Sequence, residues 1–205
     1  MSLVIGVDEA GRGPVLGPMV MVGLCIGASE RPYLQQLGVQ DSKVFGSSQK
    51  AKEQREHLAL KLMDWAYHIE IARSDEIDQW VTGKGLNALE RNMAEKILNS
   101  LPTGRVMLDG ASIFGSLCSS TIQAENKADQ RYLEVAGASI IAKHIRDQQF
   151  HNLVKPFETS YGPINGGGYP NLGTYKFVNW YVQETGDFPA FLRHSYQWKA
   201  IAHLR

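Results

Sequence analysis

The sequence predicts a mixed α/β fold in which helices flank a five-stranded sheet and a small helical appendage ends the chain. Two apolar runs near the N-terminus are separated by a short Gly/Pro connection, which indicates a pair of antiparallel strands. Short apolar runs then alternate with longer segments of helical periodicity, as in α/β sheets. After residue 155 the composition shifts to Gly and Pro. We therefore expect a core over residues 1–155 and a helical C-terminal region over residues 156–205.

The strand predictions depend on apolar runs and on alternation. The two N-terminal runs are continuous and are joined by residues 8–14, whose Gly and Pro residues favour a tight connection. A later segment alternates between apolar and polar side chains, as a half-buried strand does. Another apolar run ends at Asp109-Gly110, a typical turn pair. The predicted strands cover residues 3–7, 19–26, 67–72, 106–108 and 121–124.

The helix predictions depend on apolar side chains spaced three or four residues apart. In one segment Leu89, Met93, Ile97 and Leu101 recur at intervals of four, which places them on one helix face. The longest such pattern begins at Ala128 and carries charged residues in its second half. The predicted helices cover residues 49–66, 86–101, 128–153, 172–184 and 189–203.

Composition and charge exclude several classes of protein. The chain has 205 residues, of which 43% are hydrophobic, and 21 basic side chains balance 21 acidic ones. An intrinsically disordered chain is excluded by this apolar fraction, and no run approaches the roughly 18 apolar residues of a membrane span. Two cysteines, Cys25 and Cys118, do not make a disulfide framework and favour a reducing, cytoplasmic location. A nucleic-acid partner would have to be held by local clusters of positive charge.

Acidic residues stand where predicted strands end or a predicted helix begins. Asp8 and Glu9 follow the first strand, Asp109 follows the apolar run at 106–108, and Asp129 opens the longest helix. A carboxylate at the end of a buried strand is costly unless it faces a cleft or a partner. Four hard oxygen donors suit Mg²⁺ or Mn²⁺. Two such ions about 4 Å apart hydrolyse phosphodiesters, one activating water and the other stabilising the leaving oxygen.

The same acids also have purely structural explanations. Asp109 is compatible with a simple turn, and Asp129 with a helix start, where its charge is favourable. Asp8 and Glu9 fit a solvated loop equally well. Spacing alone leaves these explanations open beside a metal cluster.

Five motifs in order resemble the ribonuclease HII family. Residues 8–14 (Asp-Glu-Ala-Gly-Arg-Gly-Pro) resemble its N-terminal signature, and four further motifs follow in the family's order. These are Asp41-Ser42-Lys43, Leu108-Asp109-Gly110, Ala128-Asp129 with Ala138-Ser139-Ile140-Ile141-Ala142-Lys143 and Arg146-Asp147, and Gly168-Tyr169-Pro170. The related ribonuclease HIII carries a different glycine motif.

The resemblance implies an RNase H-like fold over residues 1–155 and an endoribonuclease that cuts RNA in RNA/DNA duplexes, including a lone ribonucleotide in DNA. Asp8, Glu9, Asp109 and Asp129 would then be the catalytic, metal-binding carboxylates for two ions of Mg²⁺ or Mn²⁺. The products would carry 5′-phosphate and 3′-hydroxyl ends. The implied partner is the duplex, bound by a monomer; the sequence does not show whether a sliding clamp tethers it.

The resemblance also assigns residues to substrate binding. Gly11, Arg12 and Gly13 would contact the ribose 2′-hydroxyl and a neighbouring phosphate, and Tyr169 would stack on the sugar beyond the junction. Glycine lacks a Cβ that would obstruct such an approach, and the 2′-hydroxyl is the group that distinguishes RNA from DNA.

Three basic residues are further candidates for phosphate contacts: Lys43, Lys143 and Arg146. On a continuous helix Lys143 would lie about 40° from the face of Asp129 and about 21 Å along the axis. Arg146 would lie about 100° from that face. For Lys143 and Arg146 a solvated surface charge is an equal alternative.

Two other functions remain as alternatives. One is a non-catalytic module that binds RNA/DNA hybrids on the same scaffold, although every acidic position of the motifs is filled. The other is a related nuclease, such as a junction resolvase, which would cut branched DNA without requiring a 2′-hydroxyl.

Overall fold

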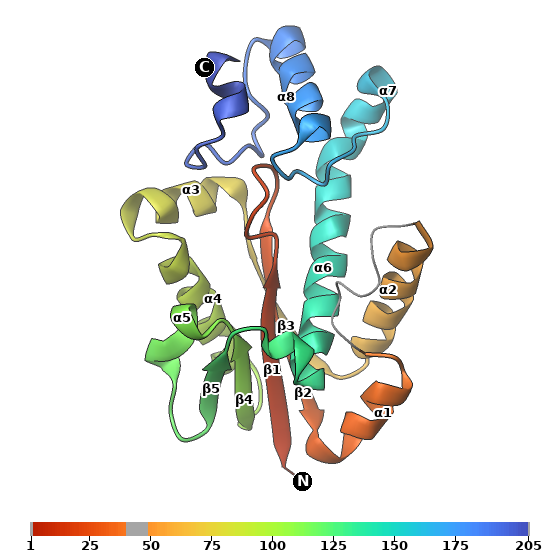
Figure 1. Ribbon diagram of the computed structural model, residues 1–205, viewed down its shortest axis with the longest axis vertical. Helices are drawn as coiled ribbons and strands as arrows, with labels where there is room; N and C mark the ends of the chain where they lie inside the picture. The colour runs from red at the N-terminus through yellow and green to blue at the C-terminus, as the bar shows by residue number, and fades with distance from the viewer. Residues whose placement is uncertain (1, 40–48, 205) are drawn as a thin grey trace. The chain divides into compact units, whose positions relative to one another are not determined.

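The computed structural model describes residues 2–39 and 49–204 (Figure 1). Its strands are β1 (Leu3–Ala10), β2 (Met19–Gly27), β3 (Ala66–Ala72), β4 (Arg105–Asp109) and β5 (Ile122–Glu125). Its α-helices are α1 (Arg31–Gln36), α2 (Gln49–Leu62), α3 (Ser74–Gly83), α4 (Leu86–Ser100), α5 (Ala111–Phe114), α6 (Leu133–Val154), α7 (Glu158–Tyr161) and α8 (Leu172–Thr185). Short 3₁₀ helices cover Ala28–Glu30, Gly115–Leu117, Ala128–Gln130, Lys155–Phe157 and Lys199–Leu204. No helix in these described ranges is long and apolar enough to cross a membrane.

The five strands form one mixed sheet in the order β3-β2-β1-β4-β5. β1 pairs antiparallel with β2 and parallel with β4, and β4 pairs parallel with β5. The central strand is therefore β1, and its carboxyl end lies at the same edge of the sheet as the carboxyl end of β4. Loops that leave this edge are the usual place for a site in an α/β sheet.

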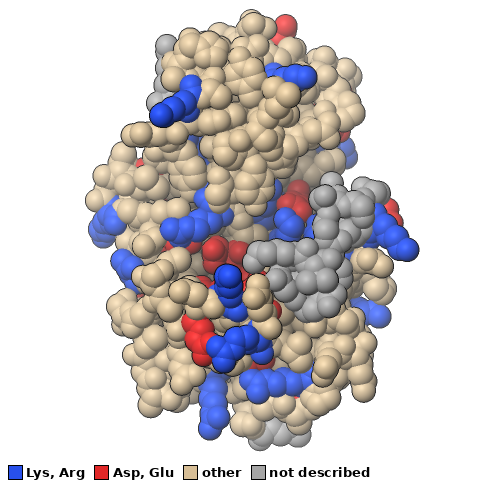
Figure 2. All heavy atoms as spheres, in the orientation of Figure 1, with Lys and Arg blue, Asp and Glu red and all other residues tan. Residues whose placement is uncertain are grey.

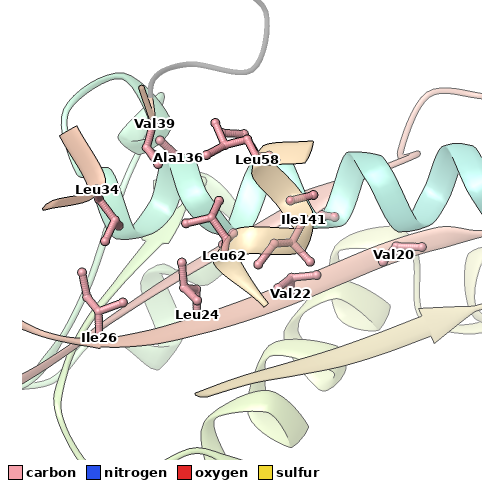
Figure 3. Close-up of a cluster of buried hydrophobic side chains, with 14 of the residues drawn as sticks. Val20, Val22, Leu24, Ile26, Leu34, Val39, Leu58, Leu62, Ala136 and Ile141 are labelled. Carbon is pink, nitrogen blue, oxygen red and sulfur yellow. The ribbon is translucent and has the colours of Figure 1, made fainter. Parts of the chain in front are cut away.

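Apolar side chains of β2 pack against helices on one face of the sheet. Figure 3 shows them facing side chains of α2 and α6, and the whole group is buried. The labelled members are Val20, Val22, Leu24, Ile26, Leu34, Val39, Leu58, Leu62, Ala136 and Ile141. Glycines allow α6 to approach closely: a Cβ on Gly6 of β1 would lie 2.2 Å from the backbone of Glu134. This packing fixes the first half of α6 against the sheet.

The five predicted strands and the mixed α/β class are confirmed. The prediction of a helix over residues 189–203 is wrong, because only its end is helical, in the 3₁₀ helix Lys199–Leu204. Backbone groups of the preceding residues instead pair with residues 15–17: the Gly17 N–H donates to Phe191 O, and the Arg193 N–H donates to Val15 O. The sequence pattern also did not predict four of the helices, α1, α3, α5 and α7.

The long helix begins later than expected. Ala128–Gln130 forms a separate 3₁₀ turn, and α6 starts at Leu133. The prediction that one continuous helix carries both Asp129 and Lys143 is therefore wrong, and the angle derived from it does not apply.

The chain divides into two compact units, each with its own core. The first comprises residues 1–10, 20–70 and 87–145 and includes most of the sheet. The second comprises residues 11–19, 71–86 and 146–205. Its core is a cluster of aliphatic and aromatic side chains around Phe177, with ring contacts to Phe157, Tyr161 and Phe191. The predicted boundary at residue 155 stays a prediction.

Candidate active site

Three predicted acids meet at the carboxyl edge of the sheet. Asp8 lies near the end of β1, Asp109 is the last residue of β4, and Asp129 lies in the 3₁₀ turn before α6. The paired stretch of β1 and β4 ends at Val7 and Leu108, so Asp8 and Asp109 are the next residues on each strand. One carboxylate oxygen from each of the three acids lies within 4.8 Å of the others. Among the residues that the structure describes, this group does not include the fourth predicted acid, Glu9.

Hydrogen bonds fix the orientation of two of these carboxylates. Asp8 Oδ1 accepts the N–H of Glu9 at 2.8 Å, and the Ser139 hydroxyl of α6 also bonds to the Asp8 carboxylate. Asp109 Oδ1 accepts the N–H of Ala128 at 2.9 Å. Since Ala128 directly precedes Asp129, this bond ties the third acid to the end of β4. The three carboxylates are therefore held by different elements that packing brings together.

The site concentrates negative charge in a poorly solvated place. Asp8 and Asp129 are buried, and Asp109 is half-buried. Burial raises the pKa of Asp8 well above its ordinary value, and the nearby charges of Glu9 and Asp109 raise it further. The hydrogen bond from Ser139 opposes this shift. Converging carboxylates of this kind are stabilised by a hard divalent cation, and the donor set fits Mg²⁺ or Mn²⁺.

The raised pKa of Asp8 predicts how the cation-free protein responds to pH. Its folded-state pKa exceeds the unfolded value of about 4, so the folded state is destabilised as pH rises from that value through the raised pKa. We expect Asp8→Asn, which keeps the acceptor oxygen, to stabilise the cation-free protein at pH 7 by about 1 kcal/mol. The melting temperature would rise by about 2–4 °C. Thermal unfolding in a chelator between pH 4 and pH 8 measures this gain, which should shrink towards pH 4.

Asp75→Asn is the control for this prediction. Its carboxylate is exposed, and a hydrogen bond from Arg73 lowers its pKa, so its replacement should not raise the melting temperature. A lower melting temperature of Asp8→Asn at pH 7 would contradict the charge repulsion inferred at the site.

A second set of predicted residues lies in the second compact unit. Gly11 has φ +91°, a conformation that favours glycine, and a Cβ there would lie 2.6 Å from Pro18 O. The N–H groups of Val15 and Leu16 both donate to Gly168 O, at 2.8 and 3.1 Å. The ring of Tyr169 lies within van der Waals distance of the position that a Cβ on Gly13 would take. The Gly-Arg-Gly loop and the Gly-Tyr-Pro loop are thus joined directly, and Tyr169 is 42% exposed.

Arg146 does not lie where a phosphate contact was predicted. Its side chain is buried, with a relative exposure of 2%, and Nη2 donates to Gly167 O at 2.6 Å. Its guanidinium stacks on the rings of Phe150 and Tyr169, at 5.0 and 5.6 Å from their centroids. The side chain thus supports the loop that carries Tyr169. Its burial removes it from the surface that a phosphate would reach.

The two predicted lysines have different outcomes. Lys143 lies half-buried in α6. Lys43 lies outside the described residues, together with the rest of the Asp-Ser-Lys motif. A phosphate contact by either lysine stays a prediction.

Sequence reasoning missed residues that hold the site together. Ser139 was part of a recognised motif, but its contact with Asp8 depends on packing of α6 against β1. Arg193, which is fully buried, donates to backbone carbonyls in the Gly-Arg-Gly loop. No local pattern indicates such a contact, since the partners are about 180 positions apart in the chain.

A mixed five-stranded sheet in this order, with carboxylates at the carboxyl ends of β1 and β4, defines the class of RNase H-like nucleases. The ribonuclease HII family model matches residues 5–199. The chain belongs to the ribonuclease HII family.

Individual relatives agree with this assignment. Ribonuclease HII of Thermococcus sibiricus is 36% identical over 212 residues, which cover 97% of this chain and 89% of that protein. The crystal structure of ribonuclease H2 from Pyrococcus horikoshii superposes with a TM-score of 0.81 at 34% identity, covering 98% of this chain and 96% of that one. A chain of the PCNA:RNase HII complex from Archaeoglobus fulgidus gives a TM-score of 0.78 at 27% identity, with the same coverage.

Family membership defines the reaction in general terms. The chain is a ribonuclease H-type hydrolase, an endoribonuclease for the RNA strand of RNA/DNA hybrids. Dependence on a divalent metal is general to this family. A non-catalytic binding module is not favoured.

Proposed function

We propose that this endoribonuclease also cuts DNA duplexes at a single embedded ribonucleotide, leaving 5′-phosphate and 3′-hydroxyl ends. The observation that carries the proposal is the convergence of Asp8, Asp109 and Asp129 within 4.8 Å at one edge of the sheet. Three such groups, two of them buried, are unfavourable together unless the site holds positive charge when it works.

Asp8, Glu9, Asp109 and Asp129 would hold the metal, with Glu9 completing the set beside Asp8. When bound, two ions of Mg²⁺ or Mn²⁺ would activate water and stabilise the leaving 3′-oxygen. The protein's own contribution is orientation. The Glu9 N–H and the Ser139 hydroxyl hold Asp8, and the Ala128 N–H holds Asp109, so the carboxylates need little reorganisation.

Recognition of the ribonucleotide falls to the joined loops of the second unit. Gly11, Arg12 and Gly13 would contact the 2′-hydroxyl and an adjacent phosphate, since the loop has no side chain at two of its three positions. Tyr169 would place its ring against the following sugar, and a 2′-hydroxyl on that sugar would collide with the ring. The preference for an RNA–DNA junction would follow from this steric clash.

Substrate binding would depend on local charge, because the chain has no net charge. On the face drawn in Figure 2, Lys and Arg side chains are interspersed with Asp and Glu side chains. A duplex would therefore be held by a few phosphate contacts, with Arg12, Lys43 and Lys143 as the candidates.

The test of the function uses three matched duplexes: all-DNA, DNA with one ribonucleotide, and a continuous RNA/DNA hybrid. With Mg²⁺ or Mn²⁺ we expect cleavage of the second and third, and an intact all-DNA duplex. Binding of the ribonucleotide duplex without cleavage would favour the non-catalytic module. Cleavage of branched all-DNA substrates, regardless of a 2′-hydroxyl, would favour a resolvase.

Replacing Tyr169 tests whether its ring selects the RNA–DNA junction. Tyr169→Ala removes the ring that would stack on the sugar beyond the junction. We expect the preference for cutting at the junction to fall about tenfold and the Mn²⁺ affinity to stay unchanged. Rates on a duplex with one ribonucleotide and on a hybrid with no junction measure this preference. Tyr169→Phe is the control, since it keeps the ring and should keep the preference. An unchanged cleavage pattern of Tyr169→Ala would exclude the role given to the ring.

The proposed oligomeric state and protein partner complete the proposal. We propose a monomer, and a PCNA-type sliding clamp as its partner, because the Archaeoglobus relative was solved as a PCNA:RNase HII complex. Gel filtration of the chain, alone and with an archaeal PCNA, tests both points.

A further inference from the structure

Arg193 is a fully buried arginine whose guanidinium is surrounded by backbone carbonyls of the Gly-Arg-Gly loop. Its relative exposure is 0%. Nη2 donates to Gly11 O at 2.7 Å, Nη1 to Arg12 O at 3.2 Å and Nε to Gly17 O at 2.9 Å. The Tyr196 hydroxyl accepts from Nη1 at 3.1 Å and donates to Arg12 O at 2.7 Å. Two consecutive carbonyls of the loop are therefore held by one planar fork.

Fixing these carbonyls also fixes the N–H groups on the other side of the same peptide units. A trans peptide is planar, with its C=O and N–H pointing in opposite directions, and the described residues contain no cis peptide bond. The carbonyls of Gly11 and Arg12 point to Arg193, so the N–H groups of Arg12 and Gly13 point away from it. Successive N–H groups that face one way form a concave site for an oxygen ligand.

The segment that carries Arg193 is itself anchored within the second unit. Asp78 of α3 accepts the N–H groups of His194 and Ser195, both at 2.8 Å. The Ser74 hydroxyl of α3 donates to Gly17 O and Phe191 O. A guanidinium held by such a segment cannot easily follow the loop if the loop moves.

Stability alone is a poor explanation for this arginine. Removing a guanidinium from water is costly, and that cost is offset only where its hydrogen bonds have good geometry. The arrangement is suited instead to fixing the direction of peptide groups, because Nε, Nη1 and Nη2 each donate to a backbone carbonyl.

We infer that Arg193, assisted by Tyr196, is a positioning residue that directs the Arg12 and Gly13 N–H groups towards the ribose 2′-hydroxyl. The inference rests on the proposed function and deepens it, since it gives the C-terminal segment a role in selecting the ribonucleotide. Arg193 does not contact substrate; it acts through the loop.

The test compares Arg193→Lys and Tyr196→Phe with the unmodified chain. Arg193→Lys keeps the charge but loses the fork, and we expect kcat on a duplex with one ribonucleotide to fall about 10- to 100-fold, with KM changed less than about threefold. Tyr196→Phe removes one hydroxyl and should lower kcat about three- to tenfold. Arg73→Lys is the matched control, since that side chain is 78% exposed, and its activity should be unchanged.

Amide hydrogen exchange and Mn²⁺ titration separate positioning from general destabilisation. In both variants we expect faster exchange at Arg12 and Gly13, unchanged exchange in the first half of α6, and unchanged Mn²⁺ affinity. If Arg193→Lys does not fold, Tyr196→Phe decides the question, because it leaves the arginine in place.

Normal kcat in both variants, with or without faster exchange at the Arg12 and Gly13 amides, would overturn the inference alone. Faster exchange throughout the chain would also overturn it, because the effect would then be on stability. If the unmodified chain cuts no ribonucleotide-containing duplex, the proposed function fails, and this inference fails with it.

Discussion

Asp109→Asn is expected to abolish cleavage while leaving duplex binding nearly intact. The amide oxygen of asparagine can still accept the Ala128 N–H, which is now held at 2.9 Å, so the turn that carries Asp129 should keep its shape. What is lost is one of three carboxylates whose oxygens lie within 4.8 Å of one another. Weaker cation binding and a misplaced nucleophile should together lower kcat by about a thousandfold or more.

Three measurements check this result: the single-turnover cleavage rate, the dissociation constant for the duplex, and Mn²⁺ affinity. Asp75→Asn is the control, because it removes the same charge from an exposed position on α3. Near-normal turnover of Asp109→Asn would falsify the assignment of this residue as a metal ligand. A large loss of duplex affinity with normal Mn²⁺ binding would show that Asp109 acts on substrate instead.

The meeting of Asp8 and Asp109 could be predicted from the sequence. Both follow buried apolar runs, and strands of one sheet that run parallel place their carboxyl ends at the same edge. What periodicity could not give was the strand order, which puts β1 beside β4 at the centre of the sheet. The five motifs that resemble ribonuclease HII supplied that information indirectly, because they implied the fold.

The position of Asp129 could not be predicted from helical periodicity. The apolar pattern continues through Ala128 and Leu133, but Lys127 adopts φ +60° and the residues after it form a 3₁₀ turn. The turn ends at Arg131, whose φ of −121° and ψ of −27° separate it from α6, and it begins directly after Lys127 in the left-handed region. Nothing in the local sequence signals this conformation, since lysine rarely adopts it.

The roles of Arg146 and Arg193 were also beyond sequence reasoning. Both are charged residues in predicted helices, and such residues usually face solvent. Their burial is explained by acceptors far away in the chain: Arg146 bonds to Gly167, and Arg193 bonds to Gly11. Long-range hydrogen bonds of this kind have no period, so a pattern of local spacing cannot reveal them.

The two compact units divide the chemistry between them. The three converging acids belong to the first unit, whereas the Gly-Arg-Gly loop, Tyr169, Arg146 and Arg193 belong to the second. In each unit a buried group holds the functional group by hydrogen bonds: Ser139 acts on Asp8, and Arg193 acts on Gly11. Variants in one unit should therefore change metal binding or ribonucleotide selection, but not both.

Gly6→Ala should destabilise the fold strongly, although it adds a single methyl group. The new Cβ would lie 2.2 Å from Glu134 C and from Val135 N, both backbone atoms in the first turn of α6. Backbone atoms cannot rotate away, so α6 must move off the central strand and open the core packed around β2. We expect a loss of about 3 kcal/mol or more, and a fall in melting temperature of about 6–12 °C.

Gly6→Ala should also lower Mn²⁺ affinity, which gives the test a second readout besides stability. Asp8 lies two residues after Gly6 in β1, and Ser139 of α6 bonds to it, so a shifted helix withdraws that bond. Mn²⁺ affinity of the folded variant should therefore fall along with its stability. Gly115→Ala is the matched control, because no atom lies within 4 Å of its Cβ position, and its stability should change by less than about 0.5 kcal/mol. Equal melting temperatures for the two variants would show that α6 packs less closely on β1 than these distances indicate.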